Sequence, residues 1–390
     1  MKTHPLVLIA VACSIAACAT VPEPTPAPPV APPAPAEWQE RIAAAADGRR
    51  VLQLGESGHG MAETYLLKTE LVRYLHRNHG FDLLAVEGGL AECWVASQRL
   101  QEWSARQSMD ACFWGAWGSE EAQALFEYLR GAAASGRPLR LVGFDNSPTS
   151  RAFLRWVETT PGLPPALLAA ERDFINLFDA GRDDDEPMAT AQARAVANYR
   201  RAYAELEDDE LRMIVADRLG TLDFDPEDFD RELFELIREE RMAANLLLHV
   251  QRNPGSRVIV WAHNAHIAHA YSHFVGGVPR QGEFVHEALG ERSYTVGIYP
   301  LRGRGYAWFV DQEYDLRPPE PGSLEARLAE LQGNPVFLDL HSAEARAMPW
   351  TREAVVSFEW GLNEQVIVPV EMYDGLLLIR EVSPITRGGD

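Results

Sequence analysis

Short apolar runs that alternate with helical stretches constrain the fold of this chain more than any other feature. Runs of four to eight apolar residues bounded by turn residues are typical of buried strands, and strands that alternate with helices predict a mainly parallel sheet. The runs that we expect to form strands are residues 51–54, 81–86, 139–144, 257–261, 294–299, 306–310, 336–340 and 375–379. The expected fold class is therefore α/β, with a mainly parallel sheet flanked by helices.

Helical spacing of apolar residues fills the intervals between these runs. It predicts helices over residues 61–78, 91–106 and 120–131. From residue 164 to about residue 252 the sequence is long, charged and helical in pattern, so we expect a large helical segment, about residues 150–252, inserted into the α/β body. Two interpretations of this segment stay open: a cap on the domain, and the outer helix layer of the same domain.

The first 36 residues predict a location in the bacterial cell envelope. A lysine precedes an apolar run that is too short to span a membrane, which is typical of a signal peptide, here residues 1–17. Residues 15–18, Ile-Ala-Ala-Cys, resemble the lipobox of bacterial lipoproteins, so Cys18 is the expected lipidation site. An ordinary signal peptide with later cleavage is the alternative. By the same resemblance, Ala19 indicates a lipid anchor in the outer membrane, facing the periplasm.

A stalk is expected between this lipid anchor and the folded body. Residues 18–36 are expected to form this stalk, because residues 21–36 are almost entirely proline and alanine, which cannot form a helix or a sheet ladder and extend as polyproline II. The body, residues 37–390, is long enough for one large domain. The net charge of -21 argues against nucleic acid as a partner. In the body, Cys93 and Cys112 could form a disulfide or remain two buried thiols.

The loop after the first expected strand carries the most reactive combination of side chains. Residues 55–60 read Gly-Glu-Ser-Gly-His-Gly. The glycines let the chain turn sharply, and Glu56 and His59 are close enough in sequence to meet within one turn. An imidazole beside a carboxylate is a good proton acceptor, because the carboxylate stabilises the imidazolium that forms. The alternative is a structural turn that merely satisfies its histidine.

Ionisable residues follow four of the expected strands. They are Glu56 and His59, Glu87, Asp145, and His263 and His266. Open α/β sheets bind ligands outside the carboxyl ends of their strands. The sequence therefore predicts a functional site at that edge of the sheet. The aromatic residues near 113–117 are expected to belong to the core instead.

Three chemistries are compatible with these residues. A nucleophilic serine is expected within Gly-x-Ser-x-Gly, and residues 55–59 miss that pattern at the last position. The groups open to a metal are His59, His263, His266, Glu56 and Glu87. However, His263 and His266 are three residues apart, whereas the zincin pair is four apart. The third chemistry uses a histidine as general base on water and needs only the residues seen.

Six segments carry a resemblance to a known family. They are Gly-Glu-Ser-Gly-His-Gly at residues 55–60, Ala-Val-Glu-Gly at 85–88, Gly-Phe-Asp at 143–145, Arg-Glu-Glu-Arg-Met-Ala-Ala-Asn at 238–245, Trp-Ala-His-Asn-Ala-His at 261–266 and Tyr-Asp-Gly-Leu-Leu-Leu-Ile at 373–379. They occur in the order found in the erythromycin esterase family, and the resemblance covers about residues 39–386. It implies an α/β core with added helices and a carboxylic ester hydrolase that opens a macrolide lactone with activated water.

The resemblance also implies roles for the site residues. His59 would be the general base, Glu56 and Glu87 would orient it or the water, and His263 and His266 would contact the reacting ester. No metal or other cofactor is implied.

Two positions depart from the family pattern, and both bear on the substrate. Gly58 stands where family members often have Ser or Thr, and Lys68 stands where they often have Arg, so a bidentate grip becomes a point charge. We expect Lys68, Asp145 and Ser57 to contact the substrate. The departures leave the small-molecule ester or lactone unidentified.

Two other functions stay open beside the esterase. The same histidines and carboxylates could serve a metal-dependent hydrolase. A non-catalytic lipoprotein that binds haem or another ligand would also suit the histidine-rich strand ends and the lipid anchor. The oligomeric state is left open as well.

Overall fold

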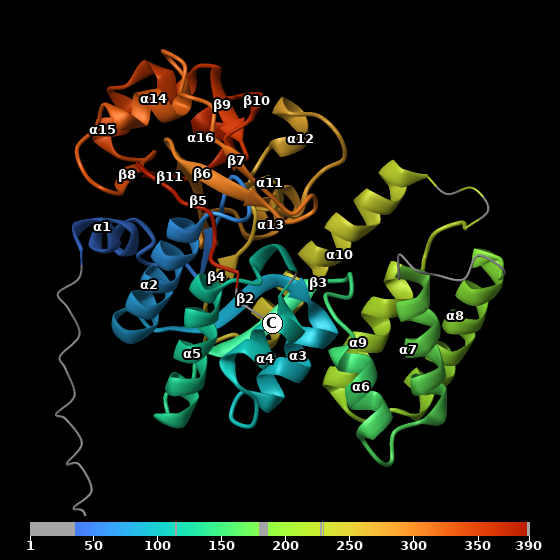
Figure 1. Ribbon diagram of the computed structural model, residues 1–390. Helices are drawn as coiled ribbons and strands as arrows, with labels where there is room; N and C mark the ends of the chain where they lie inside the picture. The colour runs from blue at the N-terminus through green and yellow to red at the C-terminus, as the bar shows by residue number, and fades with distance from the viewer. Residues whose placement is uncertain (1–35, 114, 179–185, 227, 229, 388–390) are drawn as a thin grey trace, which may run out of the picture. The chain divides into compact units, whose positions relative to one another are not determined.

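A seven-stranded sheet lies at the centre of the computed structural model (Figure 1). Its strand order is β3-β2-β4-β1-β5-β11-β8. The strands are β1 (Val51–Leu54), β2 (Phe81–Gly89), β3 (Arg140–Asp145), β4 (Arg257–Trp261), β5 (Ser293–Pro300), β8 (Val336–Asp339) and β11 (Gly375–Ile379). Neighbouring strands run parallel, except that β8 is antiparallel to β11. The expected α/β fold with a mainly parallel sheet is confirmed.

The structure describes residues 36–113, 115–178, 186–226, 228 and 230–387. The expected signal peptide, the lipid site Cys18 and the expected stalk up to residue 35 lie outside these residues. Within the described ranges, no helix combines the length and the apolar character that crossing a membrane requires.

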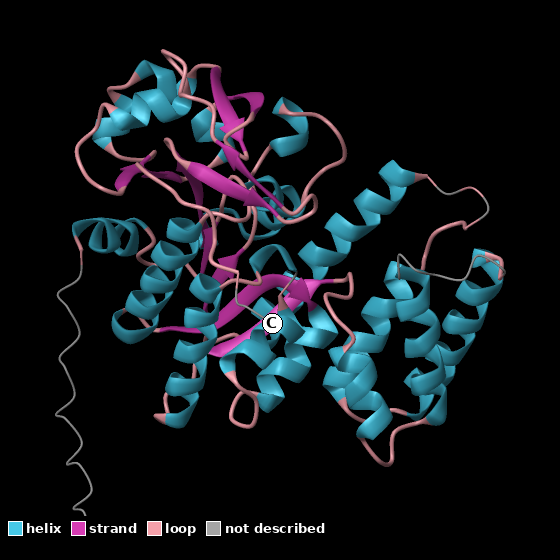
Figure 2. Ribbon diagram, in the orientation of Figure 1, coloured by secondary structure: helices cyan, strands magenta, loops and turns pink. Residues whose placement is uncertain are grey.

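Helices cover both faces of the sheet (Figure 2 shows them in cyan). They are α1 (Glu37–Ala45), α2 (Ala62–Asn78), α3 (Leu90–Arg99), α4 (Ala105–Cys112), α5 (Glu120–Ala134), α6 (Ala152–Thr159), α7 (Pro165–Phe178), α8 (Met188–Glu205), α9 (Asp209–Thr221), α10 (Arg231–Arg252), α11 (Asn264–Ile267), α12 (Tyr271–Phe274), α13 (Gln281–Leu289), α14 (Leu324–Ala329), α15 (Ala343–Arg346) and α16 (Pro369–Met372). Short 3₁₀ turns lie at Gly115–Trp117, Gly290–Arg292 and Pro349–Arg352.

The alternation of side chains along β4 explains how the sheet acquires two apolar faces. Val258 and Val260 point to the face covered by α10 and α13, whereas Ile259 and Trp261 point to the face covered by α2 and α5. A strand buried on both faces reads as a continuous apolar run, and this run predicts β4. Its expected bounds, residues 257–261, agree with the structure.

One expected helix is wrong. Residues 91–106 do not form a continuous helix, because α3 ends at Arg99 and α4 begins at Ala105. Ser104 accepts a hydrogen bond from the Gln107 backbone N–H, while the Gln107 side chain accepts one from the Ser104 N–H. This capping box starts a new helix where the apolar spacing suggested continuity. At the other end of α4, Cys112 forms a disulfide with Cys93 of α3.

The long helical segment divides between the two interpretations. Helices α6 to α9 group beside the edge strand β3 (Figure 1), and α3, α6, α7, α8 and α9 share an apolar core that is separate from the apolar clusters packed on the sheet. In contrast, α10 packs against the sheet through Met242, Ala243 and Leu246. The first group therefore stands beside the sheet, and α10 belongs to its helix layer.

Two hairpins outside the main sheet reach the loop that follows β1. They pair β6 (Arg304–Ala307) with β7 (Gln312–Asp315) and β9 (Val355–Glu359) with β10 (Asn363–Ile367). Tyr306 N–H donates to Gly60 O at 3.0 Å, and Trp360 N–H donates to Ser57 O at 2.5 Å. The expected strand at residues 306–310 thus ends earlier, at Ala307, and does not join the main sheet.

Candidate functional site

Strand register gathers the predicted site at the carboxyl edge of the sheet. Leu54 of β1 lies beside Trp261 of β4, and Trp261 lies beside Val86 of β2. Glu56 and His263 each follow two residues after the paired positions, and Glu87 follows Val86 directly. Glu56, Glu87 and His263 lie at the carboxyl ends of these three strands and therefore share one edge of the sheet.

Glu56 is the centre of the site. Its side chain is fully buried. Its Oε1 accepts a hydrogen bond from Trp117 Nε1 at 2.6 Å, and the same oxygen lies 2.6 Å from His59 Nδ1. Its Oε2 accepts from Lys68 Nζ at 2.8 Å. Burial alone would raise the pKa of Glu56, but Lys68 and His59 together hold it below its ordinary value. Glu56 is therefore an ionised carboxylate at neutral pH.

The imidazole of His59 is oriented by this carboxylate. Because an ionised Glu56 can only accept, Nδ1 carries the hydrogen, and Nε2 of the neutral ring keeps a free lone pair. Three rings confine the imidazole, with centroids 4.7 Å (Trp117), 5.0 Å (His263) and 5.1 Å (Trp360) away. The side chain remains 14% exposed. The geometry is that of a fixed proton acceptor at the edge of a largely dry site.

His266 lies between two carboxylates. Its Nδ1 is 2.9 Å from Glu239 Oε1, and its Nε2 is 3.3 Å from Glu87 Oε1. Burial would lower the pKa of His266, but Glu239 and Glu87 raise it above its ordinary value. Burial would raise the pKa of Glu239, but His266 and then Arg238 lower it to about 2. The imidazole therefore favours its charged form.

His263 has the opposite electrostatic environment. Burial, followed by repulsion from His59 and His266, lowers its pKa well below the ordinary value. Its Nδ1 accepts a hydrogen bond from Ala265 N–H at 3.2 Å, so Nε2 carries the hydrogen of the neutral ring. The ring of His263 therefore offers one neutral N–H donor close to His59.

Glu359 faces that donor from the hairpin β9–β10. Its Oε1 is 3.0 Å from His263 Nε2, although the angles are not those of a hydrogen bond. Burial and then the charge of Glu325 raise the pKa of Glu359 well above its ordinary value. We therefore treat the contact between Glu359 and His263 as one between neutral groups and not as a salt bridge.

Glu87 ties the strand ends together. Its Oε2 accepts from the backbone N–H of His263 at 2.8 Å, while its Oε1 lies 3.7 Å from Arg238 Nη2. Together with the contact to His266, these interactions join β2 to α10 and α11. Glu87 therefore positions both histidines.

The three residues expected to contact substrate are all buried. Lys68 lies against Glu56, and its Nζ is 4.2 Å from the centroid of the Trp261 ring. Asp145 accepts two hydrogen bonds from Arg238, at 2.6 and 3.2 Å. Ser57 Oγ has no hydrogen-bond partner in the described part of the chain. Lys68 and Asp145 thus hold other residues of the site in place, namely Glu56 and Arg238. Contact of Lys68, Asp145 or Ser57 with the substrate stays a prediction.

Several site residues were missed in the sequence. Trp117 is core, as expected, but its indole N–H also binds Glu56. Glu239 lies in residues 238–245, one of the segments that resemble the family. Four charged residues stand there within a helix, a pattern that is typical of a solvent-exposed face and does not mark Glu239 as a site residue. Glu359 and Trp360 come from a hairpin about 300 residues beyond the His59 loop, and no local pattern marks them.

Gly58 is required by the close approach of Trp360. A Cβ on Gly58 would lie 2.9 Å from Trp360 Cα and 3.1 Å from its ring, and Trp360 itself has a left-handed φ of 59°. The absence of a side chain at Gly58 thus lets Trp360 pack over the His59 loop.

Replacing Gly58 with Ser is expected to lower the free energy of unfolding by about 1–3 kcal/mol, because Trp360 must move. Urea unfolding would measure the change. Gly255→Ser is the matched control, since a Cβ there meets no atom within 4 Å. Equal stability of the two variants would show that Trp360 yields without cost.

Exposed apolar side chains border the site. Trp308, Phe309 and Val310, at the tip of the hairpin β6–β7, are 43%, 63% and 53% exposed. The Phe309 and Trp360 rings lie 6.1 Å apart, and Trp360 packs against His59. An apolar surface therefore extends from the candidate base to the tip of this hairpin. Within the described ranges, the candidate site included, no group of three or more His, Cys, Asp or Glu residues is arranged to hold a metal ion.

Known proteins share sequence similarity with this chain. The erythromycin esterase family matches residues 76–382. The Bacillus subtilis (strain 168) protein named "Putative hydrolase YbfO" is 26% identical over 378 residues, which cover 86% of this chain and 84% of that protein. Erythromycin esterase type I from Escherichia coli is 25% identical over 268 residues, which cover 58% of this chain and 64% of that protein.

Solved structures share the fold. A succinoglycan biosynthesis protein superposes with a TM-score of 0.75 at 19% identity, covering 91% of this chain and 94% of its own. A mutant of the erythromycin esterase EreC, in its open conformation, superposes with a TM-score of 0.62 at 17% identity, covering 89% and 94%. At such low identity, these matches establish the fold alone.

Proposed function

Because the chain belongs to the erythromycin esterase family, we propose that it hydrolyses a carboxylic ester or a macrolide-type lactone with water activated by His59. The family resemblance seen in the sequence is confirmed, and the family indicates a hydrolase. One observation carries the proposed mechanism: an ionised Glu56 holds His59 through Nδ1 and leaves Nε2 free.

The proposed reaction begins with a proton transfer. Nε2 of His59 takes a proton from water while the water oxygen attacks the ester carbonyl, and the carbonyl electron pair moves onto its oxygen. The charge that His59 gains is stabilised by Glu56. When the tetrahedral intermediate collapses, the proton on His59 passes to the leaving alkoxide, and the carboxylic acid and alcohol are released.

Stabilisation of the oxyanion is assigned to His263. The centroids of the His263 and His59 rings are 5.0 Å apart. The neutral His263 ring therefore brings its Nε2–H donor close to the proposed base. His266 has both nitrogens engaged by carboxylates, so we assign it a positioning role through Glu87 and the backbone of His263. A panel of lactones and simple esters, assayed with the full chain, tests the function directly.

Hydrolysis is expected to survive treatment with a chelator. Both nitrogens of His266 and Nδ1 of His263 are already engaged, as is Nδ1 of His59. Activity on the best ester of the panel should therefore change less than about twofold after prolonged exposure to EDTA. Loss of activity that zinc or manganese restores would favour the metal-dependent hydrolase instead.

The apolar hairpin tip is expected to bind the apolar body of the substrate. Phe309→Ala should raise KM for a macrolide lactone by about two- to tenfold and leave kcat nearly unchanged, since Phe309 meets the site through the Trp360 ring and not through His59 or Glu56 in the described structure. Leu233→Ala, which removes an exposed apolar side chain from the start of α10, is the control. An unchanged KM in Phe309→Ala would remove this tip from the substrate site.

A further inference from the structure

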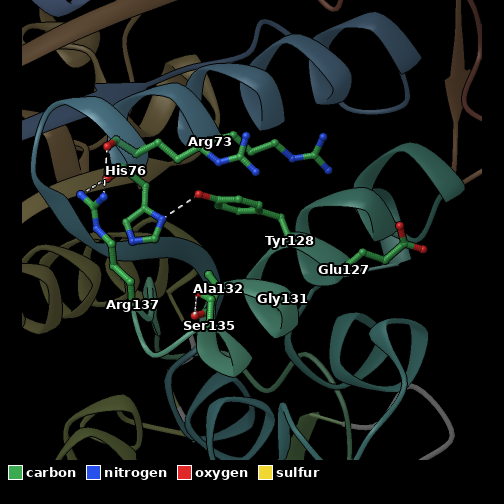
Figure 3. A pocket seen from close by; sticks show the side chains of 9 residues that line it. Arg73, His76, Glu127, Tyr128, Gly131, Ala132, Ser135 and Arg137 are labelled. Carbon is green, nitrogen blue, oxygen red and sulfur yellow. Dashed lines mark hydrogen bonds between the residues drawn. The ribbon is translucent and has the colours of Figure 1, made fainter. Parts of the chain in front are cut away.

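A second cavity, between α2 and α5, concentrates positive charge in an acidic protein (Figure 3). Its volume is about 500 Å³, within the range of small-molecule sites of roughly 300–1,000 Å³. Arg73, His76 and Arg77 line it from α2, Tyr128 from α5, and Arg137 from the segment before β3. The whole chain carries a net charge of -21, so three arginines around one cavity run against its composition.

The walls of this arginine cavity are held by their own hydrogen bonds. Arg137 donates to the backbone oxygens of His76 and Arg77 at 2.8 and 3.1 Å, which fixes the segment before β3 to the end of α2. His76 Nδ1 lies 2.7 Å from Tyr128 Oη, which joins α2 to α5. Arg73 donates to Ala124 O at 2.9 Å. The cavity is therefore built by contacts between three segments.

The positive charge of the arginine cavity is not neutralised by the protein. Within the described residues, Arg73, Arg77 and Arg137 form no ion pair with a carboxylate. The guanidinium carbons of Arg73 and Arg77 lie 5.5 and 5.2 Å from the centroid of the Tyr128 ring. Burial, and then the charges of Arg137 and Arg77, lower the pKa of His76.

Two of the residues that line the cavity also carry unsatisfied polar atoms. Arg73 Nε and His76 Nε2 are buried and have no hydrogen-bond partner in the described structure. Among the described lining residues, Glu127 alone carries a carboxylate, and it accepts from Gln123 Nε2 at 3.1 Å. Figure 3 shows that carboxylate at the opposite end of the cavity from His76.

We propose that the arginine cavity binds a small organic phosphate. Guanidinium groups pair with phosphate oxygens two at a time, and Arg suits this geometry better than Lys. The volume exceeds what the phosphate group alone requires, and the Tyr128 ring provides a wall for the organic part. Helix α2 starts near the His59 loop and carries Arg77 near its other end, roughly 20 Å away. The two sites are therefore distinct.

Calorimetric titration of the full chain with glycerol phosphate tests the proposal. We expect saturable binding that Arg77→Gln weakens between about tenfold and a hundredfold, because one charge-assisted contact is lost. Arg77 is exposed, and among the described residues its guanidinium contacts the Tyr128 ring and no backbone oxygen, so the variant should fold. Arg231→Gln, at an 86% exposed arginine, is the matched control and should bind like the unaltered chain.

A second variant and two further ligands complete the test. Arg73→Lys keeps the charge but loses the planar fork, and should weaken binding while the fold is retained. Inorganic phosphate should bind more weakly than glycerol phosphate. Absence of binding, equal binding by Arg77→Gln and the unaltered chain, or equally tight binding of succinate would each overturn the proposal of an organic phosphate site.

Discussion

Replacement of His59 by Ala or Asn is expected to lower kcat by about 10²–10⁴-fold, the usual contribution of a general base. The fold should persist, because His59 is held at the protein edge by rings on either side and by Glu56, and not within an apolar core. Steady-state kinetics on the best substrate of the ester panel would give kcat, and circular dichroism would confirm folding.

Ser57→Ala is the matched control for His59, since both residues lie in the same loop. Ser57 Oγ is buried without a hydrogen-bond partner among the described residues, so its removal should cost little stability and less than about tenfold in kcat. The general-base assignment gives Ser57 no covalent role. An inactive Ser57→Ala, or labelling of Ser57 by a phosphonate, would establish a nucleophilic serine and refute it.

The sequence predicts the sheet and the edge where the site lies, because both depend on local patterns. A continuous apolar run marks β4, and ionisable residues mark the carboxyl ends of β1, β2 and β4. The parallel pairing then brings Glu56, Glu87 and His263 together without any further information. The local sequence pattern therefore predicts that these side chains lie close together.

The environment of each side chain depends on distant segments and could not be predicted in this way. Trp360 reaches the His59 loop from a hairpin whose alternation is too weak to mark a strand. Lys68 reads as a polar residue of a helix, yet the fold turns it inward under Glu56. Burial lowers the pKa of both His263 and His266, but only His266 lies between two carboxylates that raise its pKa again, so the two imidazoles favour different charge states.

Lys68→Met is expected to destabilise the protein by about 3–5 kcal/mol at neutral pH, because it leaves Glu56 as an uncompensated buried charge. Burial raises the pKa of Glu56, and Lys68 is the main group that opposes this effect. In the unaltered chain the pKa of Glu56 lies below its unfolded value of about 4.3, so the ion pair stabilises the fold above that pH. This stabilisation is lost as the pH falls through the folded value.

The pH dependence separates a lost ion pair from lost packing. In Lys68→Met the pKa of Glu56 should rise, so the stability difference from the unaltered chain should shrink as the pH falls from 7 to 4, measured by urea unfolding. A difference that stays constant with pH would instead indicate packing alone. Lys68→Arg keeps the charge and should recover most of the stability.

Removal of both charges tests whether Glu56 acts on His59. Lys68→Met combined with Glu56→Gln leaves no buried charge at this pair, so stability should recover by about 1–3 kcal/mol over Lys68→Met alone. Activity should not recover with it, because the amide cannot stabilise the imidazolium that forms at His59. A double variant as active as the unaltered chain would show that the carboxylate only maintains the fold, and His59 would then need another partner as a base.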